Sequence, residues 1–266
     1  MPKEYLPGET PEQRKQRLRQ EKGWKKAPQV QKPVSPPPLP KPKTKPQSVP
    51  SHIPRARGVT KIDNTPLPTH DIAFVLGNGT SRAKINVQEL VGHGTIYGCN
   101  ALYREFTPDY LIAVDTKMIR EITTAGAQET NNVWTNANKY TRELKGINLF
   151  NPNLGWSSGP TALNFASHNG AKTVYILGFD YVGIGVKNEL VNNIYSGTDN
   201  YKKVNDRATY YGNWQRQTSM VIKRFPSKRY IRVVETVNSF VPDALIGLDN
   251  LEHITVEKFK KIFKIS

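Results

Sequence analysis

A strand that runs straight into a glycine-rich turn constrains this fold more than any other feature. In DIAFVLGNGTS (71–81), a buried-strand pattern over 72–76 is followed by the turn 77–81, and a helical pattern begins near Val87. In open α/β sheets such a turn sits at the carboxyl end of a strand, where backbone N–H groups and a helix N-terminus favour a phosphate. Arg82 stands where a dinucleotide fingerprint has its third glycine, and no acidic residue follows about 20 residues later. The turn therefore either binds phosphate or is a purely structural connection.

Short apolar strands alternate with helical stretches through the rest of the chain. We expect further strands at 95–99, 110–114, around 133–134, 147–150, 173–177 and 230–234. We expect helices at 101–106, 116–122, 161–168, 210–225 and 256–263. This alternation predicts βαβ units, and hence an α/β fold with a Rossmann-like parallel sheet and helices on both faces.

The composition divides the chain into two parts. Residues 1–70 hold 15 of the 20 prolines and carry 15 Lys and Arg against 5 Asp and Glu, a net charge of +10 within the whole-chain +16. Low hydrophobicity, high charge and many prolines prevent a segment from burying enough apolar surface to offset its ordering entropy. We therefore expect a disordered, basic, proline-rich arm at 1–70 and one folded domain at 71–266.

The arm contains two segments that could contact partners. Residues 9–26 open with Thr10-Pro11-Glu12-Gln13, a plausible helix start, and form either a solvated tail or a basic peptide that folds on nucleic acid, an anionic surface or a protein. The prolines of 32–46 have polyproline II spacing, which suits a spacer better than a docking peptide. Residues 1–65 are thus the candidate contact with nucleic acid or with a protein assembly.

Two later segments, the cysteine content and the lengths of the apolar runs complete this outline. Residues 182–209 are rich in Asn, Gly and Lys and predict an irregular insertion over the carboxyl edge of the sheet, either a lid or a mobile loop. The pattern VEKFKKIF (256–263) fits a packed terminal helix better than one lying on an anionic surface. Cys99 is the only cysteine, so an intrachain disulfide is excluded, and no apolar run is long enough for a transmembrane segment.

Polar side chains stand where several of the expected strands end. In a doubly wound sheet the carboxyl ends of the strands converge on one crevice, and ligands bind there. The amides suit phosphate and ribose hydroxyls, and the Ser-Ser-Gly run before Pro160 forms a second anion-receiving helix N-terminus. Each residue alone is also compatible with ordinary turn or capping chemistry. The set comprises Asn78, Ser81, Asn100, Asp115, Ser157, Ser158, Gly159, Asp180 and Tyr181.

These residues also carry a resemblance to a known family. The order VLGNGTS, YGCN and SSGPTALNFASHNGAKTVYILGFDY is similar to the small single-domain bacterial sialyltransferases, and also to uncharacterised Rossmann-like proteins, some encoded by bacteriophages. The similarity covers residues 72–181 and, more loosely, 210–239. It implies a Rossmann-like glycosyltransferase fold, a cytidine monophosphate (CMP) sugar donor and no metal or other cofactor.

The resemblance also implies a role for each matching residue. Those of the first turn, the second strand end and the sixth strand end would hold the nucleotide: Gly77, Asn78, Gly79, Ser81, Asn100, Gly178 and Phe179. Those at the Ser-Gly helix start would hold the carboxylate of the donor sugar: Ser157, Ser158 and Gly159. Asp180 would take a structural or nucleotide-side role beside Gly178 and Phe179.

The catalytic machinery of that family is incomplete in this chain. The family's catalytic histidine follows the lid in a Tyr-x-Gly-His-Ser stretch, and Asn213 stands at the best match, where an amide cannot act as a general base. Asp115 or Asp180 could serve if burial raised its pKa. Tyr181, Tyr195 and Tyr201 are candidate hydroxyl donors to the leaving phosphate. The histidines lie elsewhere: His52 and His70 in or beside the arm, His93 and His168 after or at the end of helices, and His253 in the C-terminal turn.

Two hypotheses from different classes follow. In the first, the domain binds a nucleotide or nucleotide-sugar and, if active, transfers the sugar to an acceptor. In the second, the domain is a non-catalytic scaffold, such as a structural protein of a virus particle, and the arm binds nucleic acid or neighbouring subunits. The first places the protein in the cytoplasm and the second within a virus particle.

Overall fold

The computed structural model describes Thr10, Gln13 and residues 70–266. The expected helix start is visible in its two described residues, because the Thr10 N–H donates to Gln13 Oε1 (2.9 Å) and the Gln13 N–H donates to Thr10 Oγ1 (3.3 Å). These reciprocal bonds form a capping box. The predictions of disorder over 1–70, of polyproline II over 32–46 and of partner binding by 1–65 otherwise lie outside the described residues.

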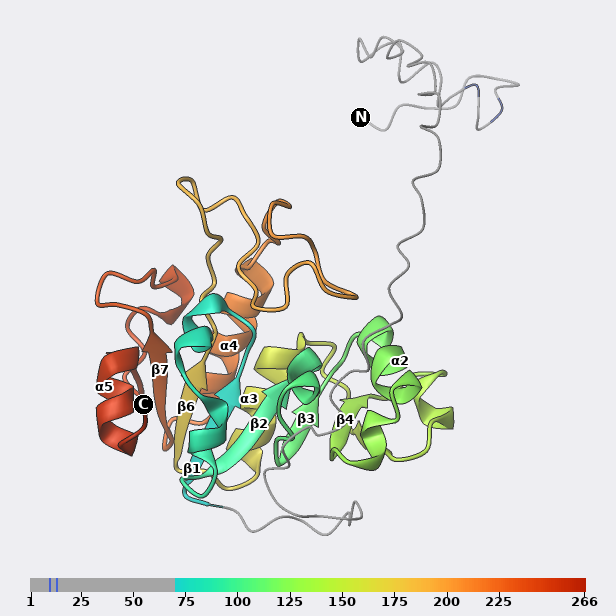
Figure 1. The fold of residues 1–266 in the computed structure, drawn as a ribbon, viewed down its shortest axis with the longest axis horizontal. Coiled ribbons are helices and arrows are strands. Elements are labelled where there is room, and N and C mark those ends of the chain that lie inside the picture. The colour runs from blue at the N-terminus through green and yellow to red at the C-terminus, as the bar shows by residue number, and fades with distance from the viewer. Residues whose placement is uncertain (1–9, 11–12, 14–69) are drawn as a thin grey trace, which may run out of the picture. The chain divides into compact units, whose positions relative to one another are not determined.

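The domain is built on a parallel sheet of eight strands in the order β5-β4-β3-β2-β1-β6-β7-β8 (Figure 1). Each strand pairs in parallel with its neighbours in this order. The predicted Rossmann-like α/β class is therefore confirmed. The strands are β1 (Ile72–Leu76), β2 (Thr95–Cys99), β3 (Tyr110–Ile112), β4 (Val133–Asn136), β5 (Ile147–Phe150), β6 (Thr173–Leu177), β7 (Arg229–Val234) and β8 (Leu251–Thr255).

Each face of the sheet has its own apolar core, because successive side chains of a strand point to opposite faces. In β1, Phe74 and Leu76 belong to one core, whereas Ala73 and Val75 belong to the other, and all four are fully buried. The first core contains α2 (Thr116–Thr124) and α5 (Val256–Phe263), and the second contains α3 (Ser158–His168) and α4 (Gly212–Arg224). Burial on both faces explains why β1 reads as an uninterrupted apolar run.

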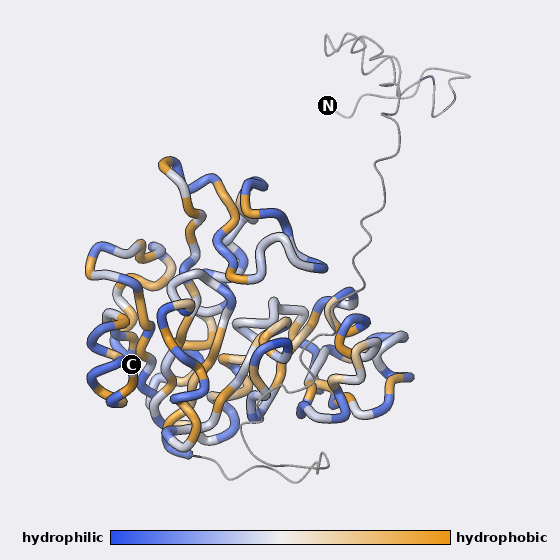
Figure 2. Tube along the Cα trace, in the orientation of Figure 1, coloured by the Kyte–Doolittle hydropathy of each residue, from blue (hydrophilic) through white to orange (hydrophobic). Residues whose placement is uncertain are grey.

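The closing helix α5 follows the prediction to the residue. Hydrophobic and hydrophilic positions alternate along it in Figure 2. Phe259 and Phe263 pack edge-on against Phe74 in the core, whereas Lys258 and Lys261 are exposed. This helix is therefore a packed terminal helix.

Strand order reverses direction at β1. From β1 the chain proceeds through β2, β3 and β4 to β5 at one edge, and then crosses to β6 on the other side of β1 before continuing to β7 and β8. The carboxyl ends of β1 and β6 therefore form the topological switch point, where open α/β sheets bind ligands. The turn 77–81 leaves β1 at this point, and the turn 178–181 leaves β6 beside it.

The structure differs from the sequence-based expectation in two respects. The segments expected to be helical after β1 and β2 form short 3-10 helices instead: η1 (Thr80–Lys84), η2 (Val87–Leu90) and η3 (Asn100–Arg104). A strand, β8, also occupies the region expected to be a C-terminal turn, so the placement of His253 in a turn is wrong. Two adjacent exposed side chains, Glu252 and His253, break the alternation by which a half-buried strand is recognised.

The insertion at 182–209 is irregular, as expected, and holds only isolated bridges between Ile184, Leu190 and Arg207. In Figure 1 it extends above the sheet, coloured yellow to orange. It is tied to the switch point, because the Ile194 N–H donates to the Asn78 carbonyl (2.9 Å) and Asn192 Oδ1 accepts from the Thr80 N–H and hydroxyl, each at 2.8 Å. The insertion therefore contributes fixed groups to this edge of the sheet.

No helix among the described residues has the length and apolar character that crossing a bilayer requires.

Candidate functional site

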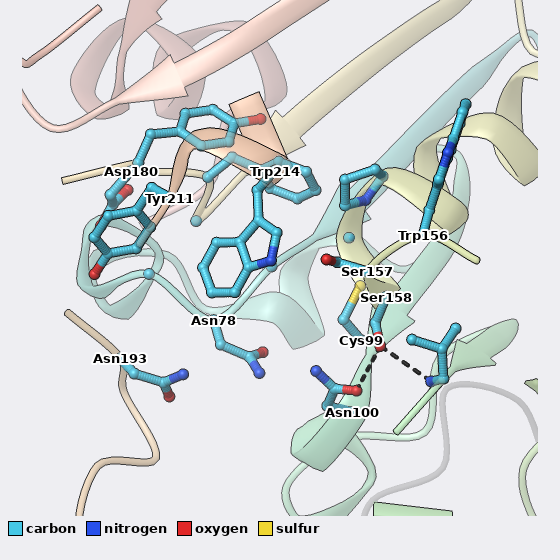
Figure 3. Close-up of a pocket in the computed structure, with 18 of the residues that line it drawn as sticks. Asn78, Cys99, Asn100, Trp156, Ser157, Ser158, Asp180, Asn193, Tyr211 and Trp214 are labelled. Carbon is cyan, nitrogen blue, oxygen red and sulfur yellow. Dashed lines mark hydrogen bonds between the residues drawn. The ribbon is translucent and has the colours of Figure 1, made fainter. Parts of the chain in front are cut away.

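A pocket of about 400 Å³ opens at the switch point (Figure 3). Its walls come from the segments that follow β1, β2, β3 and β6, from the N-terminus of α3, from the insertion and from the start of α4. We call it the switch-point pocket. Of the residues predicted from strand ends, those lining it are Gly77, Asn78, Gly79, Asn100, Asp115, Ser157, Ser158, Gly159, Gly178, Phe179, Asp180 and Tyr181.

The floor of the pocket consists of two glycine turns packed against each other. The Gly79 N–H donates to the Gly178 carbonyl (2.9 Å), and a Cβ added at Gly77 would lie 2.7 Å from that same oxygen. Gly178 itself has φ 68°, a conformation that favours glycine. A Cβ at Gly159 would lie 2.9 Å from the Phe179 ring. These glycines therefore permit close packing between turns, in addition to any approach to a ligand.

A carboxylate joins the two turns. Asp180 Oδ1 accepts a short hydrogen bond from the Ser81 hydroxyl, and Asp180 Oδ2 accepts from the Ser81 N–H at 3.1 Å. Ser81 is 5% exposed and does not line the switch-point pocket. Ser81 therefore has a structural role in this fold. Its N–H and hydroxyl orient the Asp180 carboxylate, so the hydroxyl is not available to donate to a ligand.

Two buried arginines hold the carbonyl side of the same turns. Arg82 Nε donates to the Gly77 carbonyl (2.9 Å), and Arg232 donates to the carbonyls of Phe179 (2.8 Å) and Asp180 (3.1 Å). Arg82 is 3% exposed and Arg232 is 2% exposed. Burial lowers the pKa of Arg232. With their carbonyls fixed by guanidinium groups, the turns keep their shape without a ligand.

Two amide side chains face the pocket with fixed orientations. Asn78 Nδ2 donates to the Tyr201 hydroxyl (3.1 Å), and Asn78 Oδ1 is buried with no hydrogen-bond partner among the described residues. Asn100 has φ 54°, and its Oδ1 accepts from the Ser158 hydroxyl (2.8 Å), which in turn accepts from the Val114 N–H (3.1 Å). Figure 3 shows the two amides close together. They offer a ligand one acceptor, Asn78 Oδ1, and one donor, Asn100 Nδ2.

The N-terminus of α3 supplies the anion-receiving groups. The Ser157 N–H donates to Gln217 Oε1 (3.1 Å), Pro160 has no N–H, and the N–H groups of Ser158 and Gly159 have no partner among the described residues. The Ser157 side chain makes no capping hydrogen bond. Two unpaired N–H groups, one free hydroxyl and the positive end of the helix dipole therefore meet at the pocket wall.

Aromatic side chains that the sequence reasoning missed form the outer wall. Trp156 precedes α3, and Tyr211 and Trp214 lie at the start of α4, with their rings 5.3 Å apart at 73°. In Figure 3 the Trp214 indole lies between Tyr211 and Ser157. The insertion adds Asn192 and Asn193, which were likewise not predicted. The sequence signal available for this wall was the position of Trp156, directly before the predicted Ser157.

The three tyrosines predicted as hydroxyl donors are engaged elsewhere. Tyr181 lines the pocket, but its hydroxyl donates to Thr218 (2.6 Å). Tyr195 donates to Glu105 (2.5 Å), and Tyr201 accepts from Asn78; neither lines the pocket. Burial raises the pKa of all three phenols. They position the turns and the insertion.

Besides the tyrosines, two carboxylates and one thiol line the pocket and could exchange protons. Asp180 is engaged by Ser81, whereas the exposed Asp115 carboxylate has no hydrogen-bond partner among the described residues. Burial raises the pKa of the Cys99 thiol to about 12, which makes it a poor nucleophile. No His, Lys or Arg lines the pocket in the described part of the chain, and Asn213 is exposed outside it. Asp115 is therefore the free carboxylate of the pocket, but the burial on which its predicted role as a base depended is absent.

Within residues 70–266, no group of three or more His, Cys, Asp or Glu side chains has an arrangement that could hold a metal ion.

The fold and the position of the pocket define the class: a Rossmann-like α/β protein with its ligand crevice at the switch point. No protein family model, curated protein or solved structure matches the chain.

Proposed function

We propose that the switch-point pocket binds a pyrimidine nucleotide carrying one phosphate, of the CMP or CMP-sugar type. The convergence of Asn78, Asn100 and the free N–H groups of α3 on one pocket carries this proposal. The amides would bond the hydroxyls of the ribose or the edge of the base, each of which presents donors beside acceptors. The aromatic wall, with Trp156 and Trp214, would cover the planar base.

The charge of the pocket favours a single anionic group over a polyphosphate. Its lining holds two carboxylates, Asp115 and Asp180, and no described Lys or Arg, so the α3 N-terminus is its main source of positive potential. A helix end stabilises one neighbouring anion by about 0.3–2 kcal/mol. A triphosphate would bring further charge that this pocket has no group to neutralise.

A glycosyl transfer would require only one proton acceptor from the chain. The acceptor hydroxyl would attack the anomeric carbon of the donor sugar, the bond from that carbon to the phosphate oxygen would break, and CMP would leave with the electron pair. Asp115 would take the hydroxyl proton, since its carboxylate is free and lines the pocket. Backbone N–H groups of Ser158 and Gly159 would orient the donor's acidic group.

A non-catalytic role remains the second candidate, and one observation favours it. Asn213, at the position corresponding to the histidine of the resembling family, is exposed and lies outside the pocket wall. In that case the domain would bind its nucleotide, or nothing, and serve as a scaffold for the basic arm in an assembly.

Calorimetric titration of the full chain with CMP and CTP tests the proposal. We expect CMP to bind, CTP to bind no more tightly, and Asn100→Gly to weaken CMP binding by about 2- to 12-fold, the effect of losing one hydrogen bond. Glycine keeps the positive φ of that position. Asn200→Gly is the matched control, because Asn200 also has positive φ (65°) but does not line the pocket. No heat with CMP, or equal effects of both variants, would contradict the proposal.

A further inference from the structure

A second pocket, of about 370 Å³, lies between β4, β5 and α3, and shares no lining residue with the switch-point pocket. Because β5 is an edge strand of the sheet, we call it the edge pocket. Nothing in the proposed nucleotide function uses it. Its lining residues combine one apolar surface with several polar side chains whose bonding capacity is unused.

The apolar surface of the edge pocket is aromatic. Trp134 of β4, Phe150 of β5 and Phe165 of α3 all line it and are partly exposed. The ring centroids of Trp134 and Phe165 are 4.6 Å apart, and those of Trp134 and Phe150 are 5.3 Å apart. This cluster gives a ligand an extended hydrophobic face that is held rigidly by packing within the group.

Besides Asn151, three asparagine amides line the edge pocket and retain free donors and acceptors. The Asn136 side chain has no hydrogen-bond partner among the described residues. Asn169 Nδ2 donates to Tyr97 (3.2 Å), which leaves its oxygen free, and Asn164 Oδ1 accepts from Arg224 (3.4 Å), which leaves its nitrogen free. Each amide can thus donate to, or accept from, a ligand hydroxyl.

A buried hydroxyl supplies the independent indication that this pocket is made for a polar ligand. Thr161 is 3% exposed and lines the edge pocket, and its Oγ1 has no hydrogen-bond partner among the described residues. An unpaired buried hydroxyl is costly, and a bound molecule that pairs with it removes the cost.

Among the described residues, the edge pocket has one permanently charged lining group, a cation. Arg224 and His168 line it, and no Asp or Glu does so in the described part of the chain. The guanidinium group of Arg224 is exposed, lies 6.0 Å from the Trp156 ring and has no carboxylate partner among the described residues. The pocket therefore favours a neutral or anionic ligand over a cationic one.

We propose that the edge pocket binds a carbohydrate unit that carries an acidic group. A sugar ring can pack its C–H face on the aromatic cluster while its hydroxyls pair with the amides and with Thr161, and Arg224 pairs with the acid. A planar aromatic acid would use the cluster and Arg224 but would leave the amides and Thr161 unpaired. The unpaired amides and Thr161 hydroxyl therefore favour an acidic carbohydrate over a planar aromatic acid. This inference does not depend on nucleotide binding at the switch-point pocket.

The test follows the ¹H–¹⁵N signals of the full chain by NMR during titration with glucuronate, glucose and benzoate. We expect glucuronate to shift the indole N–H of Trp134 and the side-chain N–H of Arg224. Glucose should bind the same site about threefold to fivefold more weakly, the contribution expected of a partly exposed ion pair. Benzoate should bind more weakly than either sugar. Benzoate binding as tight as that of glucuronate, or glucuronate shifts that omit Trp134, would overturn the proposal.

Two variants separate the contributions without disturbing the core. Arg224→Gln should abolish the preference for glucuronate over glucose, whereas Arg216→Gln, an exposed arginine on the same helix outside the pocket, should preserve it. Thr161→Val keeps the shape and removes the unpaired hydroxyl, so it should raise the melting temperature and weaken sugar binding by about 2- to 12-fold. A raised melting temperature with unchanged sugar affinity would overturn the assignment of Thr161.

Discussion

Replacing Asp180 by alanine should destabilise the domain far more than replacing Asp115, although both carboxylates line the same pocket. Asp180 accepts two hydrogen bonds from Ser81, a residue that is 5% exposed and would keep an unpaired N–H and hydroxyl in Asp180→Ala. Hydrogen bonds to a charged group contribute about 1.5–3 kcal/mol each to folding stability. Because the structure around the mutated site can relax and recover part of that, we expect the free energy of unfolding of Asp180→Ala to fall by about 3 kcal/mol. Asp115→Ala removes only a helix-dipole interaction of about 0.3–1 kcal/mol.

Urea unfolding of the full chain, followed by circular dichroism, measures this difference. With a slope of about 2 kcal/mol per molar urea, Asp180→Ala should lower the midpoint by about 1.5 M and Asp115→Ala by about 0.5 M or less. Equal shifts of the two midpoints would refute the reasoning, because they would show that the Ser81 contacts contribute nothing beyond a surface charge. If the domain transfers a sugar, the order reverses for activity: Asp115→Ala should abolish turnover while retaining affinity for CMP.

Three further predictions concern Cys99, Glu121 and Gly159. Burial raises the pKa of Cys99 to about 12, so iodoacetamide at about pH 8 should alkylate the folded chain far more slowly than the urea-unfolded chain; similar rates would show an accessible thiolate. For Glu121, burial raises the pKa but hydrogen bonds, first that from Tyr103, outweigh it and lower the pKa overall. A carboxyl with a lowered folded pKa stabilises above its unfolded pKa and ceases to do so as pH falls through the folded value, so Glu121→Gln should lower the melting temperature at about pH 7 and not at about pH 3. Gly159→Ala should destabilise by about 1–3 kcal/mol, because its methyl group would meet Phe179, whereas helix propensity alone predicts stabilisation.

The sheet was predictable from the sequence because its central strands are buried on both faces. Ile72–Leu76 and Thr173–Leu177 are short apolar runs bounded by turns, and parallel pairing requires their carboxyl ends to meet. The edge strand Leu251–Thr255 was missed because two of its five residues are exposed and its polar side chains follow no alternation. The other edge strand, β5, has no buried residue and was nevertheless predicted, because three of its four residues are apolar. Apolar content, rather than burial itself, therefore determined which strands could be recognised.

Part of the candidate site was also predictable from the sequence. Asn78 and Asn100 could be placed because they follow strands whose ends converge. Trp156 and Trp214 could not, because tryptophans before or within a helix are equally common in cores, and Asn192 lies in an insertion with no periodicity to position it. Nor does a sequence indicate where a hydroxyl points, which is why Tyr195 could be proposed as a donor and yet bonds Glu105 instead.

Arg82 and Arg232 hold the two glycine turns in place, so the floor of the pocket is stabilised differently from its rim. The floor is rigid before any ligand arrives, so little ordering entropy is lost when one binds there. Within the insertion, the pocket-lining Asn192 is held by hydrogen bonds, whereas Tyr195 belongs to the core on one face of the sheet and Ile194 packs against that core. Ligand preference can therefore diverge through changes at the insertion's two pocket-lining residues, Asn192 and Asn193, which lie outside that core, with little effect on the folding stability of the sheet.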